Sequence, residues 1–126
     1  MSDRALGIPR VVWIVAAMVL AVLAAAAALL PPRGTPGIEI ADLGDTLAMT
    51  LHGVGYALLA FCAMLAQRSP RLAPTAVGLV AYGFFLEMTQ GVLGLRSVEL
   101  GDMIANAGGV LVGVALALLV PRSTPA

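Results

Sequence analysis

Six side chains that could bind a ligand or move a proton lie in the carboxyl-terminal half of the chain, within one of its most apolar stretches. Carboxylates accept hydrogen bonds, amides donate and accept them, and a guanidinium can clamp a phosphate with two parallel bonds. An earlier imidazole, His52, is the only side chain expected to titrate near neutral pH. The six are Glu87, Gln90, Arg96, Glu99, Asp102 and Asn106.

The spacing of these polar residues places them in pairs that share helix faces. Residues three or four apart lie beside each other on a helix surface. The pairs are His52 with Tyr56, Glu87 with Gln90, and Asp102 with Asn106. We therefore expect each of three helices to present two polar side chains in one direction.

The composition of the chain is typical of membrane-spanning helices. The 126 residues are 60% hydrophobic and 11% charged, and the mean hydropathy is +1.00. Soluble domains carry about 25% charged residues. The apolar residues also form long blocks rather than alternating, which predicts membrane spans and an integral membrane protein.

Four blocks are long enough to cross the hydrocarbon core, which takes about 20 helical residues. They cover about residues 11–30, 47–66, 72–93 and 103–120. Every backbone amide in lipid needs an internal partner, so each block must be a helix. The predicted fold is all-α, a bundle of four transmembrane helices forming a single domain over residues 1–126, with residues 31–45 as a connecting loop.

The first block has a second interpretation. Pro31 and Pro32 end it, and the preceding run of alanines resembles a signal-peptide cleavage site. A signal core is usually about 7–15 residues, shorter than this block. We expect an uncleaved first span.

Arginine placement predicts the orientation, because short cytoplasmic loops are enriched in basic residues. Both termini and the turn after the second span are basic, whereas the other two connections hold one arginine each among acids. Both termini should therefore be cytoplasmic. The basic positions are Arg4, Arg10, Arg68, Arg71 and Arg122.

This orientation brings the polar residues to one depth. His52 falls about one and a half turns, or ~8 Å, below the outer surface. Glu87 lies in the last turns of the third span and Asn106 one turn into the fourth. An ionised Asp at a helix centre costs about 2.5–3.5 kcal/mol on insertion scales. We expect the polar groups to satisfy one another in a shared pocket beneath the outer rim.

These motifs resemble the VanZ-like family of membrane proteins, over about residues 45–119. The resemblance implies a small multi-span bundle associated by name with glycopeptide antibiotic resistance. The family often has an Asp-Lys pair where this chain has Ala48 and Met49, and Asp45 is the candidate substitute for that acid. The motifs are His52-x-x-x-Tyr56, Glu87-x-x-Gln90, Arg96, and Asp102-x-x-x-Asn106-x-x-Gly109-x-x-x-Gly113.

Each residue of this set also has a purely structural interpretation. His52 could be a base, a proton relay or a headgroup contact, or a buried imidazole bonded to Glu87 or Asn106. Arg96 could clamp an anion or extend to lipid phosphates. Asp102 could cap the fourth helix. Small residues four apart let helices approach closely. We expect Gly109 and Gly113 to serve packing.

Several classes of partner and chemistry find no support in the sequence. No basic stretch with interleaved aromatics supports nucleic-acid binding, and no nucleophile-elbow or phosphate-loop motif occurs. A single cysteine, Cys62, excludes a disulfide, and one His with one Cys is too few for a structural zinc site, so we expect no metal and no cofactor.

Three functions remain open. The preferred one is a site for an anionic lipid-linked or peptidoglycan-type envelope precursor, open to the outer leaflet of a bacterial cytoplasmic membrane. The second is an enzyme that acts on such a molecule by acid/base chemistry. The third is a scaffold fastened by its polar cluster. Membrane lipids are expected partners, and a homo-oligomer is compatible with each function.

Overall fold

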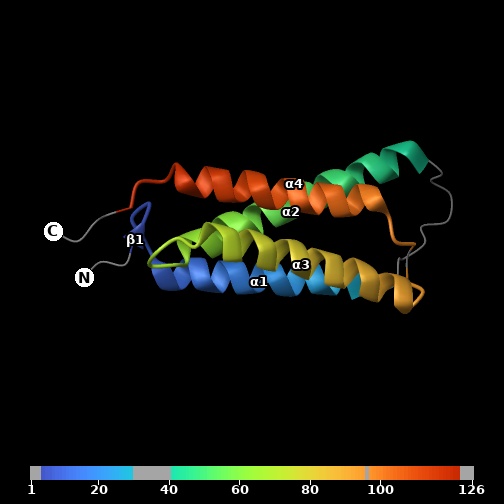
Figure 1. Cartoon of the computed structure of the whole chain (residues 1–126), viewed down its shortest axis with the longest axis horizontal. Coiled ribbons are helices and arrows are strands. Elements are labelled where there is room, and N and C mark those ends of the chain that lie inside the picture. Colours follow the sequence, from blue (N-terminus) through green and yellow to red (C-terminus); the bar gives the residue numbers. More distant parts are fainter. Residues whose placement is uncertain (1–3, 30–40, 96, 123–126) are drawn as a thin grey trace.

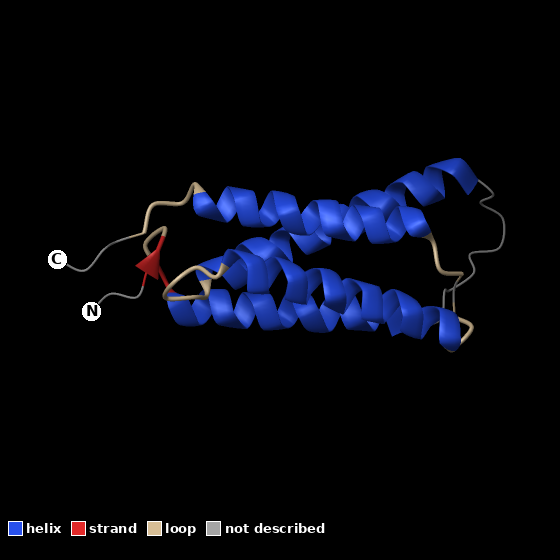
Figure 2. Cartoon of the chain, in the orientation of Figure 1, coloured by secondary structure: helices blue, strands red, loops and turns tan. Residues whose placement is uncertain are grey.

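Four helices form the body of the protein. The computed structural model describes residues 4–29, 41–95 and 97–122, with the backbone alone for residues 41–45. Successive helices run in opposite directions (Figures 1 and 2), and each contains a segment long and apolar enough to cross a membrane. The prediction of an all-helical chain with four candidate spans is confirmed. The helices are α1 (Arg10–Leu29), α2 (Ala41–Leu65), α3 (Leu72–Val92) and α4 (Leu100–Leu118).

Two helix starts were predicted too late. The connecting loop was expected to extend to residue 45, but α2 begins at Ala41. The fourth helix was expected from residue 103 and begins at Leu100. Hydropathy marks the segment suited to lipid, whereas a helix can continue past that segment into polar sequence. Acidic residues near a helix N-terminus favour such an extension.

The core of the bundle is the seam between α2 and α4, which pack against each other more extensively than any other pair. Met64 and Val110 are its largest fully buried side chains. A Cβ at Gly109 would collide with the backbone carbonyl of Gly53, and one at Gly113 with the carbonyl of Ala57. The two glycines therefore permit a backbone-to-backbone approach, as small residues do between helices in lipid.

Helix α1 lies at the edge of this core. None of its residues is buried, and Val15, Met18 and Val22 are each more than half exposed. Its contacts with the other helices include a hydrogen bond from Tyr82 of α3 to the Ala21 carbonyl at 2.6 Å and an edge-to-face contact of Trp13 with Phe61, with centroids 5.9 Å apart. Such an apolar, unburied surface suits lipid rather than water.

The end of the bundle that carries the first and last described residues is closed by a small hairpin. Strands β1 (Arg4–Ala5) and β2 (Ile8–Pro9) pair antiparallel, and the turn residues Leu6 and Gly7 both have positive φ, 56° and 74°. Two successive residues with positive φ are typical of the type I′ turn, which connects the strands of a tight hairpin. Ala5 also bridges to Arg122, which places both ends of the described chain on the same side.

Two arginines at this end bind backbone carbonyls in the last turn of α2 and in the two residues that follow it. Arg10 donates to the Ala66 carbonyl at 2.5 Å. Arg122 donates to the carbonyls of Gln67 and Met64 at 2.8 and 2.9 Å. The last carbonyls of a helix lack intrahelical partners and lie at its negative end, so cationic donors stabilise them. We call Arg10, Arg122 and these three carbonyls the arginine cap.

Candidate functional site

Four polar side chains meet in the half of the bundle opposite the arginine cap. His52 extends from α2, Glu87 from α3, and Asp102 and Asn106 from α4. The His52 Nδ1 donates to Asn106 Oδ1 at 2.9 Å. The same Nδ1 lies 4.0 Å from Glu87 Oε1, and His52 Nε2 lies 3.8 Å from Asp102 Oδ2. We call these four residues the acid–histidine cluster.

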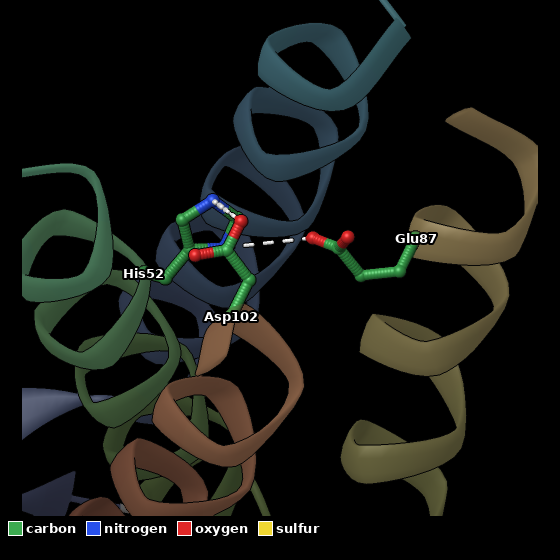
Figure 3. Close-up of side chains that lie close together, drawn as sticks. All are labelled: His52, Glu87 and Asp102. Carbon is green, nitrogen blue, oxygen red and sulfur yellow. Dashed lines mark ion pairs between the residues drawn. The ribbon is translucent and has the colours of Figure 1, made fainter. Parts of the chain in front are cut away.

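The geometry of this cluster is convergent. Figure 3 shows the Glu87 carboxylate reaching from α3 toward His52, with the Asp102 carboxylate next to the imidazole ring. Both carboxylates are 3% exposed and Asn106 is 4% exposed, whereas the His52 side chain is 23% exposed. The acids are thus enclosed by protein while the imidazole retains an accessible side.

An apolar cavity of about 360 Å³ adjoins the cluster. His52, Glu87 and Asn106 belong to its lining, while α1 contributes mainly small side chains, including Ala24 and Ala27. The cavity therefore has a polar region formed by three helices and an apolar wall formed by the fourth. Binding pockets commonly combine an apolar lining with a few convergent polar groups.

Tyr56 and Gln90, the partners of His52 and Glu87 in the sequence pairs, also line the cavity. Both are buried, at 6% and 4% exposure. A Cβ at Gly83 would lie 3.1 Å from the Tyr56 ring, so this glycine of α3 leaves room for the phenol. The structure thus places five predicted site residues in the lining of one cavity, and Asp102 next to His52. The five are His52, Tyr56, Glu87, Gln90 and Asn106.

Of the remaining site predictions, two concern side chains that the structure does not describe and one concerns the start of α4. Arg96 lies outside the described residues, as does the side chain of Asp45. Asp102 is not the N-cap of α4, because that position belongs to Glu99. It sits instead in the first turn, where a carboxylate favours the positive end of the helix dipole. From this turn it faces His52.

Three residues of the cluster have the chemistry of metal ligands. One donor atom each from His52, Glu87 and Asp102 lie within 4.8 Å of one another. The sequence expectation of no metal counted only Cys and His, and the carboxylates raise the number of candidate ligands to three. Asp and Glu oxygens bind zinc alongside His nitrogens in open sites.

The chain was also compared with known proteins. No protein-family model, curated protein or solved structure matches it. Functional inference therefore depends on the cluster and its cavity.

Proposed function

We propose that this chain is a VanZ-like protein of the bacterial cytoplasmic membrane that binds the polar end of a lipid-linked or peptidoglycan-type envelope precursor. The observation that carries the proposal is the buried acid–histidine cluster bordering an apolar cavity. A lipid-linked precursor has the same division, a polar headgroup on an apolar chain. The link to glycopeptide resistance belongs to the family resemblance and is part of the proposal.

The charges of the cluster determine which part of the headgroup it would bind. Two carboxylates facing one imidazole repel a phosphate but accept hydrogen bonds from hydroxyl and amide groups. We therefore assign the sugar or peptide portion of the precursor to Glu87, Asp102 and Asn106. The anionic portion is assigned to Arg96, on the basis of its guanidinium chemistry and its place in the sequence between α3 and α4.

The direct test is binding of an undecaprenyl-type phosphosugar lipid to the protein in nanodiscs, followed by native mass spectrometry. Wild type should retain the lipid, and Glu87→Gln and Arg96→Ala should retain at least tenfold less, a loss of about 1.4 kcal/mol. Glu99→Gln is the matched control, since Glu99 is an exposed acid outside the cluster. Equal retention by all four proteins would refute the proposal.

A second test fills the cavity. Ala24→Phe places a large ring in the cavity wall, whereas Ala81→Phe makes the same change at an exposed position of α3 that is not part of the lining. We expect only Ala24→Phe to weaken lipid retention. If both variants bind like wild type, the cavity is not the binding site.

The proposal includes an orientation with both termini in the cytoplasm, supported by the arginine distribution. It places Ser69 inside and Glu99 outside. In a Cys62→Ala background, an impermeant thiol reagent applied to intact cells should label Glu99→Cys and not Ser69→Cys. The opposite labelling pattern would invert the topology and place the cluster near the inner leaflet.

A membrane enzyme is the second candidate, and the His52–Asp102 approach favours it. An imidazole beside carboxylates is suited to moving a proton on a bound molecule. Turnover of the same lipid by purified wild type, absent in His52→Gln, would distinguish this function from binding. Retention of intact lipid by wild type would favour the binding site.

A further inference from the structure

The three ionisable side chains of the cluster present a ligand set that neither the family resemblance nor the proposed function assigns. They come from three different helices, so their convergence is a property of the tertiary structure rather than of one acidic stretch. We propose that His52, Glu87 and Asp102 bind a divalent transition-metal ion of the Zn²⁺ type. The inference goes beyond the proposed function and does not depend on it.

The hydrogen bond to Asn106 prepares the imidazole for this role. His52 Nδ1 donates to Asn106 Oδ1 at 2.9 Å, so the neutral ring carries its proton on Nδ1 and leaves the Nε2 lone pair available. Metal-binding histidines usually donate their other ring N–H to a fixed oxygen in this way, which sets the tautomer and the ring orientation. Nε2 is also the nitrogen that faces Asp102.

The distances between the candidate ligands are those of groups surrounding an ion. His52 Nε2 lies 3.8 Å from Asp102 Oδ2, beyond the range of a direct hydrogen bond, and one donor atom from each of the three residues lies within 4.8 Å of the others. Ligand atoms bound to Zn²⁺ at about 2.0–2.2 Å lie about 3.4 Å apart in a tetrahedron. A contraction of about 0.4 Å between His52 and Asp102, and of at most about 1.4 Å between any two of the donor atoms, would therefore close the set around one ion.

Charge and burial favour an ion at this place. Glu87 and Asp102 are each 3% exposed, in helices long and apolar enough to lie in lipid. Holding charge on two buried carboxylates is costly in such surroundings, and a cation placed between them reduces that cost. A divalent cation balances both acids while the imidazole remains neutral.

The cavity supplies the access that a fourth ligand needs. Open zinc sites use three protein ligands and leave one position for water or another small molecule. His52 and Glu87 are part of the lining of the 360 Å³ cavity, so the ion would face it. The metal would then be accessible to a molecule bound there.

The test uses zinc alone, with no lipid precursor added. The full chain in detergent is stripped with chelator, dialysed against micromolar Zn²⁺ with excess Mg²⁺, and measured for bound metal by mass spectrometry. Wild type should hold about one zinc per chain, whereas Glu87→Gln and Asp102→Asn should hold at least tenfold less at the same free zinc. Glu99→Gln, the matched exposed-acid control, should load like wild type.

Two results would overturn the inference. One is wild type that retains no zinc, and the other is equal loading of wild type, Glu87→Gln and Asp102→Asn, which would show binding elsewhere on the chain. A spectroscopic measurement on wild type tests the site in a way that does not depend on whether the variants fold. Co²⁺ should give the intense visible absorption of a low-coordinate nitrogen–oxygen site, and a spectrum like that of Co²⁺ in buffer would contradict the proposal.

The zinc result separates from the lipid result. Failure of zinc binding with intact lipid retention removes the metal site and leaves the proposed function standing. Zinc binding without lipid retention refutes the proposed function and leaves the metal site standing.

Discussion

The arginine cap and the acid–histidine cluster lie in opposite halves of the bundle and use their polar side chains differently. In the cap, Arg10 and Arg122 donate to backbone carbonyls at distances of 2.5–2.9 Å. In the cluster, side chains face other side chains, and the imidazole–carboxylate separations are 3.8 and 4.0 Å. Only the cluster adjoins the cavity of 360 Å³.

The difference teaches how to distinguish a structural polar residue from a functional candidate in a membrane helix. The end of α2 requires donors because its last carbonyls have no partners within the helix, so the cap is explained by the fold itself. No comparable backbone requirement explains two buried carboxylates beside one imidazole. Ionisable groups buried within helices that are apolar enough to span a membrane are by default functional candidates, and the cluster fits that description while the cap does not.

The largest effect is expected at the seam that holds α4 against α2 beside the cluster. Gly109→Ala would push a methyl group into the Gly53 carbonyl, and overpacking of this kind costs about 1–3 kcal/mol. Because the obstacle is backbone, we expect the upper part of that range. The loss in the free energy of unfolding is measured by denaturation in mixed detergent micelles.

The neighbouring glycine is the control for this substitution. A Cβ at Gly108 meets nothing within 4 Å, and alanine is favoured over glycine within a helix by about 0.5–1 kcal/mol. Gly108→Ala should therefore leave stability unchanged or raise it. If Gly109→Ala behaves like Gly108→Ala, the close approach does not hold the cluster together.

The next largest effect is expected in the cap. Arg122→Met removes two hydrogen bonds to the Gln67 and Met64 carbonyls, each worth about 1.5–3 kcal/mol when one partner is charged. Partial exposure of Arg122 reduces this, and we expect a loss of about 1–2 kcal/mol. Zinc loading and lipid retention should be unchanged. Arg71→Met, at an exposed position, serves as the control, and an equal loss there would show a general effect of arginine removal.

A smaller effect is expected where α1 is tied to α3. Tyr82→Phe deletes the hydrogen bond to the Ala21 carbonyl, which contributes about 0.5–1.5 kcal/mol. Thr89→Val is the control, because the Thr89 hydroxyl donates to the Phe85 carbonyl of its own helix. In thermal unfolding in detergent, Tyr82→Phe should unfold at a lower temperature than Thr89→Val. The reverse ranking would mean that α1 does not depend on this contact.

The sequence predicted the helices better than the spaces between them. Hydropathy alone marks helices that are long and apolar enough to cross a membrane, so their number and approximate limits could be read without tertiary information. The meeting of His52, Glu87 and Asn106 followed from alternating helix direction and the 3.6-residue period. These inferences require only where each residue lies along its helix.

Other features depended on packing and could not be read in this way. The cavity exists because α1 presents small side chains such as Ala24 and Ala27 toward α2 and α3, and hydropathy does not report side-chain size. Arg10 and Arg122 were interpreted only as markers of orientation, and their hydrogen bonds to α2 were missed. The Leu6-Gly7 turn has a recognisable signal, a glycine in a two-residue loop, but it lies outside the apolar blocks.

The smallest effect on stability, and the sharpest separation of the two regions, is expected from Glu87→Gln. The amide preserves the size of the side chain, and His52 still has Asp102 and Asn106 as neighbours. One of two carboxylates sharing a single imidazole is neutralised, which relieves like-charge repulsion and offsets the lost attraction to the ring. We expect the free energy of unfolding to change by less than about 1 kcal/mol, while zinc loading and lipid retention fall. A loss of stability as large as that of Arg122→Met, with the Glu99→Gln control unaffected, would show that the cluster fastens helices as the cap does, and the distinction between the two regions would no longer hold.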